Sequence, residues 1–381
     1  MDFSFSEDLQ AVGDLARQVL TDQVTQERLK EVEAGQVGID RRTWAELAKT
    51  NLLGVALPEE VDGSGLGFLA ACVLMYEVGR AVAPVPVLAS VVMGSLAVVE
   101  WGTADQKQRL LPGAISGERI LTAALVEDGT DAAHPATTAT RIESDQDGGP
   151  GEWRLDGVKF CVPAGSLASD FLVPARTGED TVGVFIVPAG SRGLGVVPEL
   201  TTSRQPEARL ELDGVVVGAA DVLGAPSGGR PIVEWIEERA TTAICAATAG
   251  ICEQAVRMTA EYTKTREQFD RPIASFQAVG QRAADAYIDA EAIRLTAWQA
   301  AWRIDAGLPA SAEVAVAKFW AADGGQRVVH AAQHLHGGIG VDRDYPLHRY
   351  FLWAKQLELT LGGATSQLRT LGALLAAEPV S

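Results

Sequence analysis

The sequence predicts an α+β protein in which an N-terminal helical domain, a small β-domain and a C-terminal four-helix bundle follow one another. Three observations predict this order. Apolar residues recur at helical spacing in the first third of the chain, runs of β-branched and aromatic residues fill the middle, and long helical patterns return afterwards. We therefore expect a helical domain over residues 1–120, a middle β-barrel or sandwich domain over 121–228, and the bundle over 229–381.

The first helices are predicted by periodicity and by the loop that follows them. One helical face is formed by apolar side chains at Leu9, Val12, Leu15, Ala16 and Val19. Residues 57–67, Leu-Pro-Glu-Glu-Val-Asp-Gly-Ser-Gly-Leu-Gly, are rich in turn-forming types. A second helical run is expected from Phe68 to about Ala83.

The middle region has the pattern of short strands joined by turns. Asp156-Gly157 and Asp213-Gly214 each separate two apolar runs, and Asp-Gly is a frequent two-residue hairpin turn. We predict hairpins at both pairs, strands at 171–173 and 182–187, and an exposed loop over 144–151.

The bundle is predicted by four helical stretches, at residues 231–260, 274–304, 310–332 and 348–376. Short connections between long helices favour an antiparallel arrangement. In the second helix, one buried stripe is predicted from spacings of three and four residues, at Ile288, Ala292, Leu295, Trp298 and Trp302.

Composition and charge argue against nucleic-acid binding. The 381 residues include 50 acidic and 32 basic ones, for a formal charge of −18. A duplex-binding surface needs clustered Lys and Arg, so we expect no nucleic-acid partner.

The longest apolar stretch, Val85 to Val99, is too short to span a bilayer, and the N-terminus lacks signal-peptide features. We expect no membrane insertion and a cytoplasmic location.

No metal site or disulfide framework is predicted. The cysteines contain no CxxC pair and are expected to be buried thiols in a reducing compartment: Cys72, Cys161, Cys245 and Cys252. His330, His334 and His336 are spaced along one helix, but no nearby carboxylate completes a ligand set.

Two motifs in the second half of the chain are its most informative features. Residues 262–277 read Tyr-Thr-Lys-Thr-Arg-Glu-Gln-Phe-Asp-Arg-Pro-Ile-Ala-Ser-Phe-Gln. A pyrophosphate is well held by a guanidinium such as that of Arg266. Residues 333–340 read Gln-His-Leu-His-Gly-Gly-Ile-Gly, and adjacent glycines let a backbone approach a phosphate closely.

With these motifs, and with the phrase from Trp44 to Gly65, the chain resembles the acyl-CoA dehydrogenase family. These flavoenzymes oxidise the Cα–Cβ bond of an acyl-CoA thioester. The resemblance covers nearly the whole chain. It implies FAD between the β-domain and the bundle, an acyl-CoA substrate, a tetramer, and an electron-transfer flavoprotein or similar acceptor.

The resemblance also implies which residues contact FAD. The family pattern of Arg, Phe, Gly, Pro-Ile and Phe-Gln is kept except that Asp270 stands at the Gly. The implied cofactor-binding residues are Arg266, Gln268, Phe269, Gln277, Gln333, His334, Gly337, Gly338, Thr365, Ser366 and Gln367. The family usually has Gln three residues before the first Gly, where this chain has His334, with Gln333 beside it. Which of the two reaches the cofactor stays open.

The catalytic base of the family is missing from its expected positions. Gly362 occupies the place of the acidic residue before Thr-Ser-Gln, and Ala240 occupies the alternative place on the first bundle helix. Glu238 and Glu358 are the nearest candidates, together with Glu237, but none aligns.

The β-domain departs from the family as well. Cys161 and Pro163 stand where the family has a Trp and a Thr that pack on the isoalloxazine and hydrogen-bond it. Residues 125–131 read Leu-Val-Glu-Asp-Gly-Thr-Asp in place of the family's Leu-Thr-Glu-Pro. The resemblance therefore implies that the chain's own flavin site is eroded, while the residues expected to reach a neighbour's flavin are kept.

Three interpretations follow. The chain is the non-catalytic subunit of a mixed α2β2 acyl-CoA dehydrogenase, a kind of assembly the family includes in bacterial steroid side-chain degradation, with a homologous α subunit that supplies the base. Alternatively, it is a self-sufficient homotetramer with a relocated base, at Glu237, Glu238 or Glu358. The third interpretation is a redox-inactive structural or binding subunit.

Overall fold

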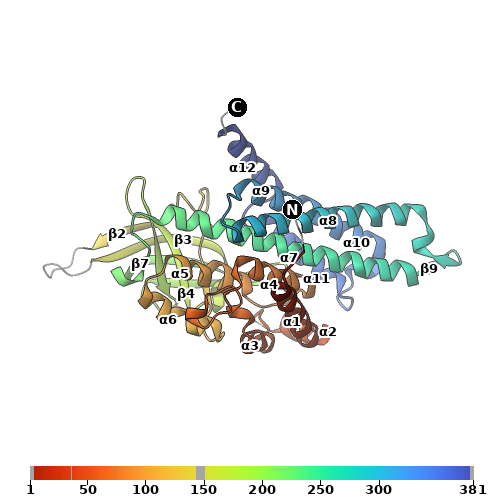
Figure 1. The fold of residues 1–381 in the computed structure, drawn as a ribbon, viewed down its shortest axis with the longest axis horizontal. Helices are drawn as coiled ribbons and strands as arrows, with labels where there is room; N and C mark the ends of the chain where they lie inside the picture. The colour runs from red at the N-terminus through yellow and green to blue at the C-terminus, as the bar shows by residue number, and fades with distance from the viewer. Residues whose placement is uncertain (1–3, 36, 143–150, 378–381) are drawn as a thin grey trace. The chain divides into compact units, whose positions relative to one another are not determined.

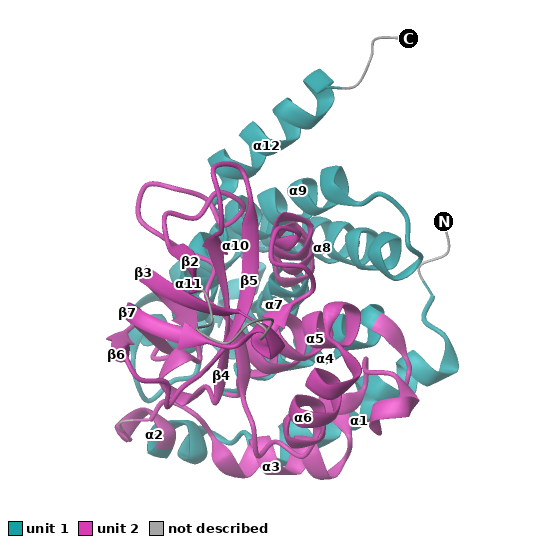
Figure 2. Cartoon of the chain, turned by 90° about the vertical axis from the view of Figure 1, so that its left-hand side faces the viewer, with its two compact units in different colours: residues 1–31, 68–84, 241–381 teal, residues 32–67, 85–240 magenta. Residues whose placement is uncertain are grey.

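The computed structural model describes residues 4–35, 37–142 and 151–377. The chain forms two compact units, shown in separate colours in Figure 2. Unit 1 comprises residues 1–31, 68–84 and 241–381, and unit 2 comprises residues 32–67 and 85–240. The sequence-based boundaries near 120 and 228 stay a prediction.

Unit 1 is helical, and its elements can be followed in Figure 1. Its helices, some of which continue into unit 2, are α1 (Glu7–Gln23), α2 (Gln26–Ala34), α4 (Gly67–Ala81), α7 (Gly229–Thr265), α8 (Gln277–Asp305), α9 (Ser311–Phe319), α10 (Gly325–His336), α11 (Leu347–Leu359) and α12 (Ala364–Ala377). The predicted third bundle helix is divided by a π-helical turn, Trp320–Gly324, and the predicted fourth is broken between α11 and α12.

The buried face of α8 differs from the predicted stripe. Trp298 is buried, but Ile288, Leu295 and Trp302 are 63%, 39% and 40% exposed. The inward face instead carries small side chains together with Ile293, Trp298 and Ile304, because α8 packs against α9 and α10. The prediction of one buried stripe was therefore wrong, and large apolar side chains of α8 face outward.

Helices α4 and α7 approach each other at two glycines. A Cβ on Gly79 would collide with the backbone oxygen of Ala247, and a Cβ on Gly250 would collide with that of Tyr76. Both sites lie within unit 1. The two helix backbones are therefore in direct contact, which only residues without a side chain permit.

Unit 2 holds α3 (Arg41–Lys49), α5 (Leu96–Trp101), α6 (Ala104–Ile115) and an eight-stranded sheet. The strands are β1 (Leu121–Ala123), β2 (Thr138–Ile142), β3 (Glu152–Pro163), β4 (Asp170–Arg176), β5 (Val182–Pro188), β6 (Leu194–Leu200), β7 (Pro206–Val217) and β8 (Val222–Leu223). Their order is β6-β7-β3-β2-β4-β5-β8, with β1 beside β4. The α+β class is confirmed. The sheet is mixed and follows an open path, so the closed barrel that was one expectation for this domain was wrong.

The two predicted Asp-Gly hairpins are wrong. Asp156-Gly157 lies inside β3 and Asp213-Gly214 lies inside β7. The two strands pair with each other, and their register shifts between Leu155 and Gly157. The Gly214 N–H donates to the Asp156 carboxylate at 2.8 Å. The Asp-Gly pairs therefore form irregularities in long strands, not turns. The predicted loop at 144–151 lies, except for Gly151, outside the described residues.

The cysteines follow the prediction with one exception. Cys72, Cys245 and Cys252 are buried and form no disulfide, whereas Cys161 is exposed. The structure also contains, among its described residues, no helix long and apolar enough to cross a membrane.

Candidate cofactor and catalytic site

The turn after Arg266 projects from the ends of two long helices. Helix α7 ends at Thr265, and β9 (Glu267–Gln268) pairs with β10 (Arg271–Pro272) before α8 begins (Figure 1). Phe269 and Asp270 between them have φ of 55° and 60°. Asp enters this left-handed region more readily than most residues, so Asp270 keeps a turn for which the family uses Gly.

Contacts among its own side chains stabilise this turn, and the Arg266 guanidinium is left without a partner among the described residues. The Arg271 guanidinium lies 4.1 Å from the centroid of the Phe276 ring, which meets Phe269 edge-on. Within the described part of the chain, the Arg266 guanidinium has no ion-pair partner. The cofactor-binding residues predicted in this segment are all exposed: Arg266, Gln268, Phe269, which is 87% exposed, and Gln277. An exposed, uncompensated guanidinium fits a pyrophosphate supplied from outside this chain.

The glycine motif forms an open turn at the end of α10. Gly337 has φ 64°, and a Cβ on Gly337 or Gly338 would meet no atom within 4 Å. This geometry leaves room for a ligand to approach the backbone. Gln333 is half-buried and His334 is exposed. The choice between these two side chains as cofactor contacts stays open.

His336 fixes this turn to the Arg266 segment. Its ring stacks on Tyr262 with centroids 4.4 Å apart. Its Nδ1 donates to the Ala332 carbonyl at 2.8 Å, so Nε2 accepts from the Tyr345 hydroxyl at 3.1 Å. Burial lowers the pKa of His336 and favours the neutral ring. His336 therefore has a structural role.

The loop between α11 and α12 disfavours a side chain at the expected base position. Gly362 has φ 92°, and a Cβ there would lie 3.1 Å from Ser366 Oγ and 3.2 Å from Gln367 Nε2. The Gln367 side-chain amide also donates to the Leu361 carbonyl at 3.2 Å. Thr365 and Ser366 are exposed on the first turn of α12. An acidic residue at 362 would therefore have both a strained backbone and crowded neighbours.

The other base candidates differ in their surroundings. Ala240 is fully buried. The Glu358 carboxylate is bound by Lys355 at 2.6 Å, and Glu238 lies 3.8 Å from Arg239. Burial, with smaller contributions from nearby Asp131 and Glu234, raises the pKa of Glu237 to about 7. Among these carboxyl groups, Glu237 has the environment most suited to proton transfer near neutral pH.

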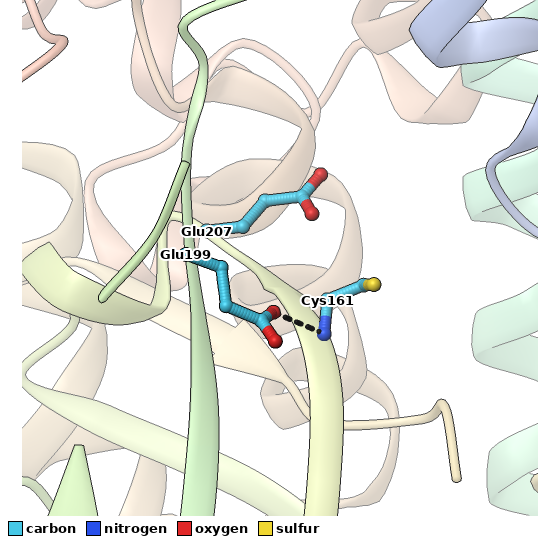
Figure 3. Close-up of side chains that lie close together, drawn as sticks. All are labelled: Cys161, Glu199 and Glu207. Carbon is cyan, nitrogen blue, oxygen red and sulfur yellow. Dashed lines mark hydrogen bonds between the residues drawn. The ribbon is translucent and has the colours of Figure 1, made fainter. Parts of the chain in front are cut away.

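In unit 2, Cys161 has acidic neighbours that sequence reasoning missed. Its N–H donates to Glu199 at 2.8 Å, and its thiol lies with the Glu199 and Glu207 carboxylates in one cluster (Figure 3). Burial, followed by the charges of Glu207 and Glu199, raises the pKa of the Cys161 thiol. No sequence signal links these residues, because only the register of three strands brings them together.

The residues described above fit FAD unequally. The Arg266 turn and the open glycine turn suit a pyrophosphate and its approach to backbone. The cluster at Cys161 does not suit a flavin ring, because two carboxylates oppose the electron density that the ring gains when it is reduced. The Arg266 turn and the glycine turn therefore fit the pyrophosphate of FAD better than the surroundings of Cys161 fit its ring.

Comparison with known proteins places the chain in a class. Residues 6–118 match the family model "Acyl-CoA dehydrogenase, N-terminal domain", and residues 231–375 match "Acyl-CoA dehydrogenase, C-terminal domain". The chain belongs to the acyl-CoA dehydrogenase family, whose members are FAD-binding oxidoreductases that act on acyl-CoA thioesters. Both the fold and the family predicted from sequence are confirmed.

Three individual proteins are similar to this chain over nearly its whole length. The chain is 42% identical to "Acyl-CoA dehydrogenase FadE27" of Mycobacterium tuberculosis, with 100% of each sequence covered. A chain in the ChsE4-ChsE5 complex, also from M. tuberculosis, matches with TM-score 0.92, 41% identity and 100% of both chains. A chain of the Tcur3481-Tcur3483 steroid ACAD matches with TM-score 0.88 and 46% identity, over 97% of this chain and 98% of that one.

Proposed function

We propose that this chain is the subunit without the catalytic base in a mixed α2β2 acyl-CoA dehydrogenase that introduces an α,β double bond into a steroid-derived acyl-CoA. Two structural relatives support a homologous partner, because each is a named pair of proteins, ChsE4-ChsE5 and Tcur3481-Tcur3483. The second pair is described as a steroid ACAD, which supports the substrate class. A cytoplasmic location belongs to the same proposal.

The conformation of Gly362 carries the proposal. A φ of 92° and neighbours within 3.1–3.3 Å of a built Cβ make this position unsuitable for the acidic side chain of the family. The alternative position holds a fully buried alanine, Ala240. The carboxylate that removes the α-proton is therefore expected from the partner subunit.

The division of labour follows from which groups this chain offers. Arg266 binds the FAD pyrophosphate from across the subunit interface. The turn at Gly337 and Gly338 lets the cofactor approach the backbone N–H groups. The other expected contacts to the partner-held cofactor come from Gln268, Phe269 and Gln277, with Gln333 or His334. When bound, FAD supplies the acceptor for the hydride that leaves Cβ, while the α-proton goes to the partner's carboxylate. An electron-transfer flavoprotein or a similar acceptor then takes the electrons.

Outward apolar surface supports an assembled state. Tyr287 and Ile288 on α8 are 57% and 63% exposed. None of the residues of α12, all of which the structure describes, is buried, although Leu368 and Leu375 lie on it. Figures 1 and 2 show α12 extending beyond α9 within unit 1. Exposed large apolar side chains on these two helices support the proposal of an interface between chains.

A self-sufficient enzyme is the second candidate, and Glu237 is the observation that favours it. A carboxyl group with a pKa of about 7 is suited to act as a general base. In that case Glu237→Gln would abolish flavin reduction by acyl-CoA in the chain purified alone, whereas Glu358→Gln would not.

Expression with and without the product of the neighbouring homologous gene tests the proposal. We expect a colourless or unstable chain alone and a yellow heterotetramer when the two are produced together. A yellow homotetramer with one FAD per chain would overturn the proposal in favour of the self-sufficient enzyme. A colourless complex would instead favour a redox-inactive subunit.

A further inference from the structure

Three neighbouring strands of unit 2 gather metal-binding side chains at one place. Glu199 of β6 lies directly opposite Glu207 of β7 in the antiparallel register. Strand β7 pairs in turn with β3, where Val162 lies opposite Ala208 beside Cys161. One ligand atom from each of Cys161, Glu199 and Glu207 lies within 4.8 Å of the others (Figure 3).

The pairing of two glutamates is unfavourable by itself. Like charges directly opposite each other on adjacent strands destabilise a sheet. Glu207 is only 7% exposed, and a hydrogen bond with the Cys161 thiol supports its buried carboxylate. The Cys161 thiol lies against the same carboxylates, so the cluster combines negative charge with a sulfur ligand.

We propose that Cys161, Glu199 and Glu207 form a binding site for a zinc ion, with the fourth position open to solvent. Zinc coordinates thiolate, carboxylate and imidazole groups, whereas Mg²⁺ and Ca²⁺ take oxygen ligands, so the sulfur of Cys161 selects zinc. Binding displaces the thiol proton to solvent, and the ion cancels the repulsion between the two glutamates.

The geometry requires only a small closure of the cluster. Zn–S is about 2.3 Å and Zn–O about 2.0–2.2 Å, which places tetrahedral ligand atoms roughly 3.3–3.6 Å apart. Atoms that now lie within 4.8 Å must therefore approach by about 1 Å. Cys161 is exposed and gives the ion a path from solvent, while Glu207 anchors the inner side.

Metal titration of the purified full-length chain tests this site. After treatment with a chelator, the chain is titrated with Zn²⁺ in competition with a chromophoric chelator, and with Co²⁺ to detect thiolate-to-metal charge transfer. We expect one equivalent per chain and a charge-transfer band. Cys161→Ser should abolish that band, and Cys161→Ser, Glu199→Gln and Glu207→Gln should each weaken Zn²⁺ binding at least about tenfold, because even outer-shell partners are worth roughly 10–100-fold.

Glu211→Gln is the matched control, because it removes an exposed carboxylate of β7 that is bound to Arg209. This variant should bind zinc as the unmodified chain does. Circular dichroism checks that each variant is folded, and the exposed position of Cys161 makes Cys161→Ser the safest of the three. Absence of saturable binding, or binding that Cys161→Ser leaves unchanged, would overturn the proposal. Flavin content does not enter this test, so it is independent of the proposed dehydrogenase role.

Discussion

The ring of Tyr262 stacks on that of His336, with centroids 4.4 Å apart and 20° between the planes. Tyr262 begins the segment that carries Arg266, and His336 immediately precedes the Gly337-Gly338 turn. The two predicted cofactor motifs, separated in sequence by α8, α9 and most of α10, are therefore joined by an aromatic contact. The position of the Arg266 turn relative to the glycine turn depends on that contact.

Replacement of His336 should change how stability depends on pH. Burial lowers the pKa of His336 below its ordinary value of 6.5, so as the pH falls the unfolded chain binds the extra proton first. The free energy of unfolding should decline as the pH falls below about 6.5. His336→Phe keeps a ring against Tyr262 but cannot titrate, so part of that decline should disappear. Urea denaturation between pH 5 and 8 measures it, with the exposed His334→Ala as control.

Removal of the Arg266 guanidinium should weaken FAD binding in the assembled complex. A hydrogen bond to a charged group contributes about 1.5–3 kcal/mol, so Arg266→Ala should raise the Kd for FAD by at least about tenfold. Arg266→Lys should retain only part of the FAD affinity, because an ammonium group cannot form the bidentate contact of a guanidinium. Lys264→Ala, at an exposed cation paired with Glu261, is the control. Equal FAD affinity in Arg266→Ala and the unmodified complex would contradict the assignment.

Substitution at Gly362 should destabilise the chain without creating activity. A side chain at φ 92° costs about 1–3 kcal/mol, and Ser366 must also move to admit it. Gly362→Glu should therefore lower the free energy of unfolding and give no turnover in the chain alone. Gly363→Ala is a close control, since its Cβ would meet only the Glu358 carbonyl, at 3.7 Å. Turnover by Gly362→Glu would show that the loop accepts a base after all.

The contact between α4 and α7 should be sensitive to a single methyl group. Gly79→Ala and Gly250→Ala each place a Cβ against backbone that cannot rotate away, so each should cost about 1–3 kcal/mol or more. Gly280→Ala in α8 has open space around its Cβ and should instead stabilise the helix by about 0.5–1 kcal/mol. Thermal denaturation of the three variants compares these effects, and equal melting temperatures would contradict the described packing.

The long helices were predictable because their periodicity is local. The stretch predicted at 274–304 corresponds to α8, Gln277–Asp305. Its buried face was not predictable in the same way, because residues such as Ile288 and Ala290 both fit a helical stripe and only the packing of α9 and α10 selects between them. The outward-facing Ile288 is suited to a contact with another chain, which the sequence of this chain alone does not specify.

The β-domain shows where local signals fail. Asp-Gly favours a turn, but a glycine with positive φ also fits an irregularity within a strand, as Gly214 does at φ 66°. The Cys161 cluster could not be found from sequence, because it needs the registers of β6, β7 and β3 together. The position of the family's acidic residue, in contrast, could be located from sequence, because the family motif aligns it with Gly362.

The number of flavins per assembled complex tests the central claim most directly. The chain is produced together with its homologous partner, native mass spectrometry establishes the subunit composition, and absorbance of released FAD is measured against it. An α2β2 complex with one FAD per αβ pair, two in all, is the predicted result. Four FAD molecules per tetramer would contradict the claim that this chain lacks a complete flavin and catalytic site of its own.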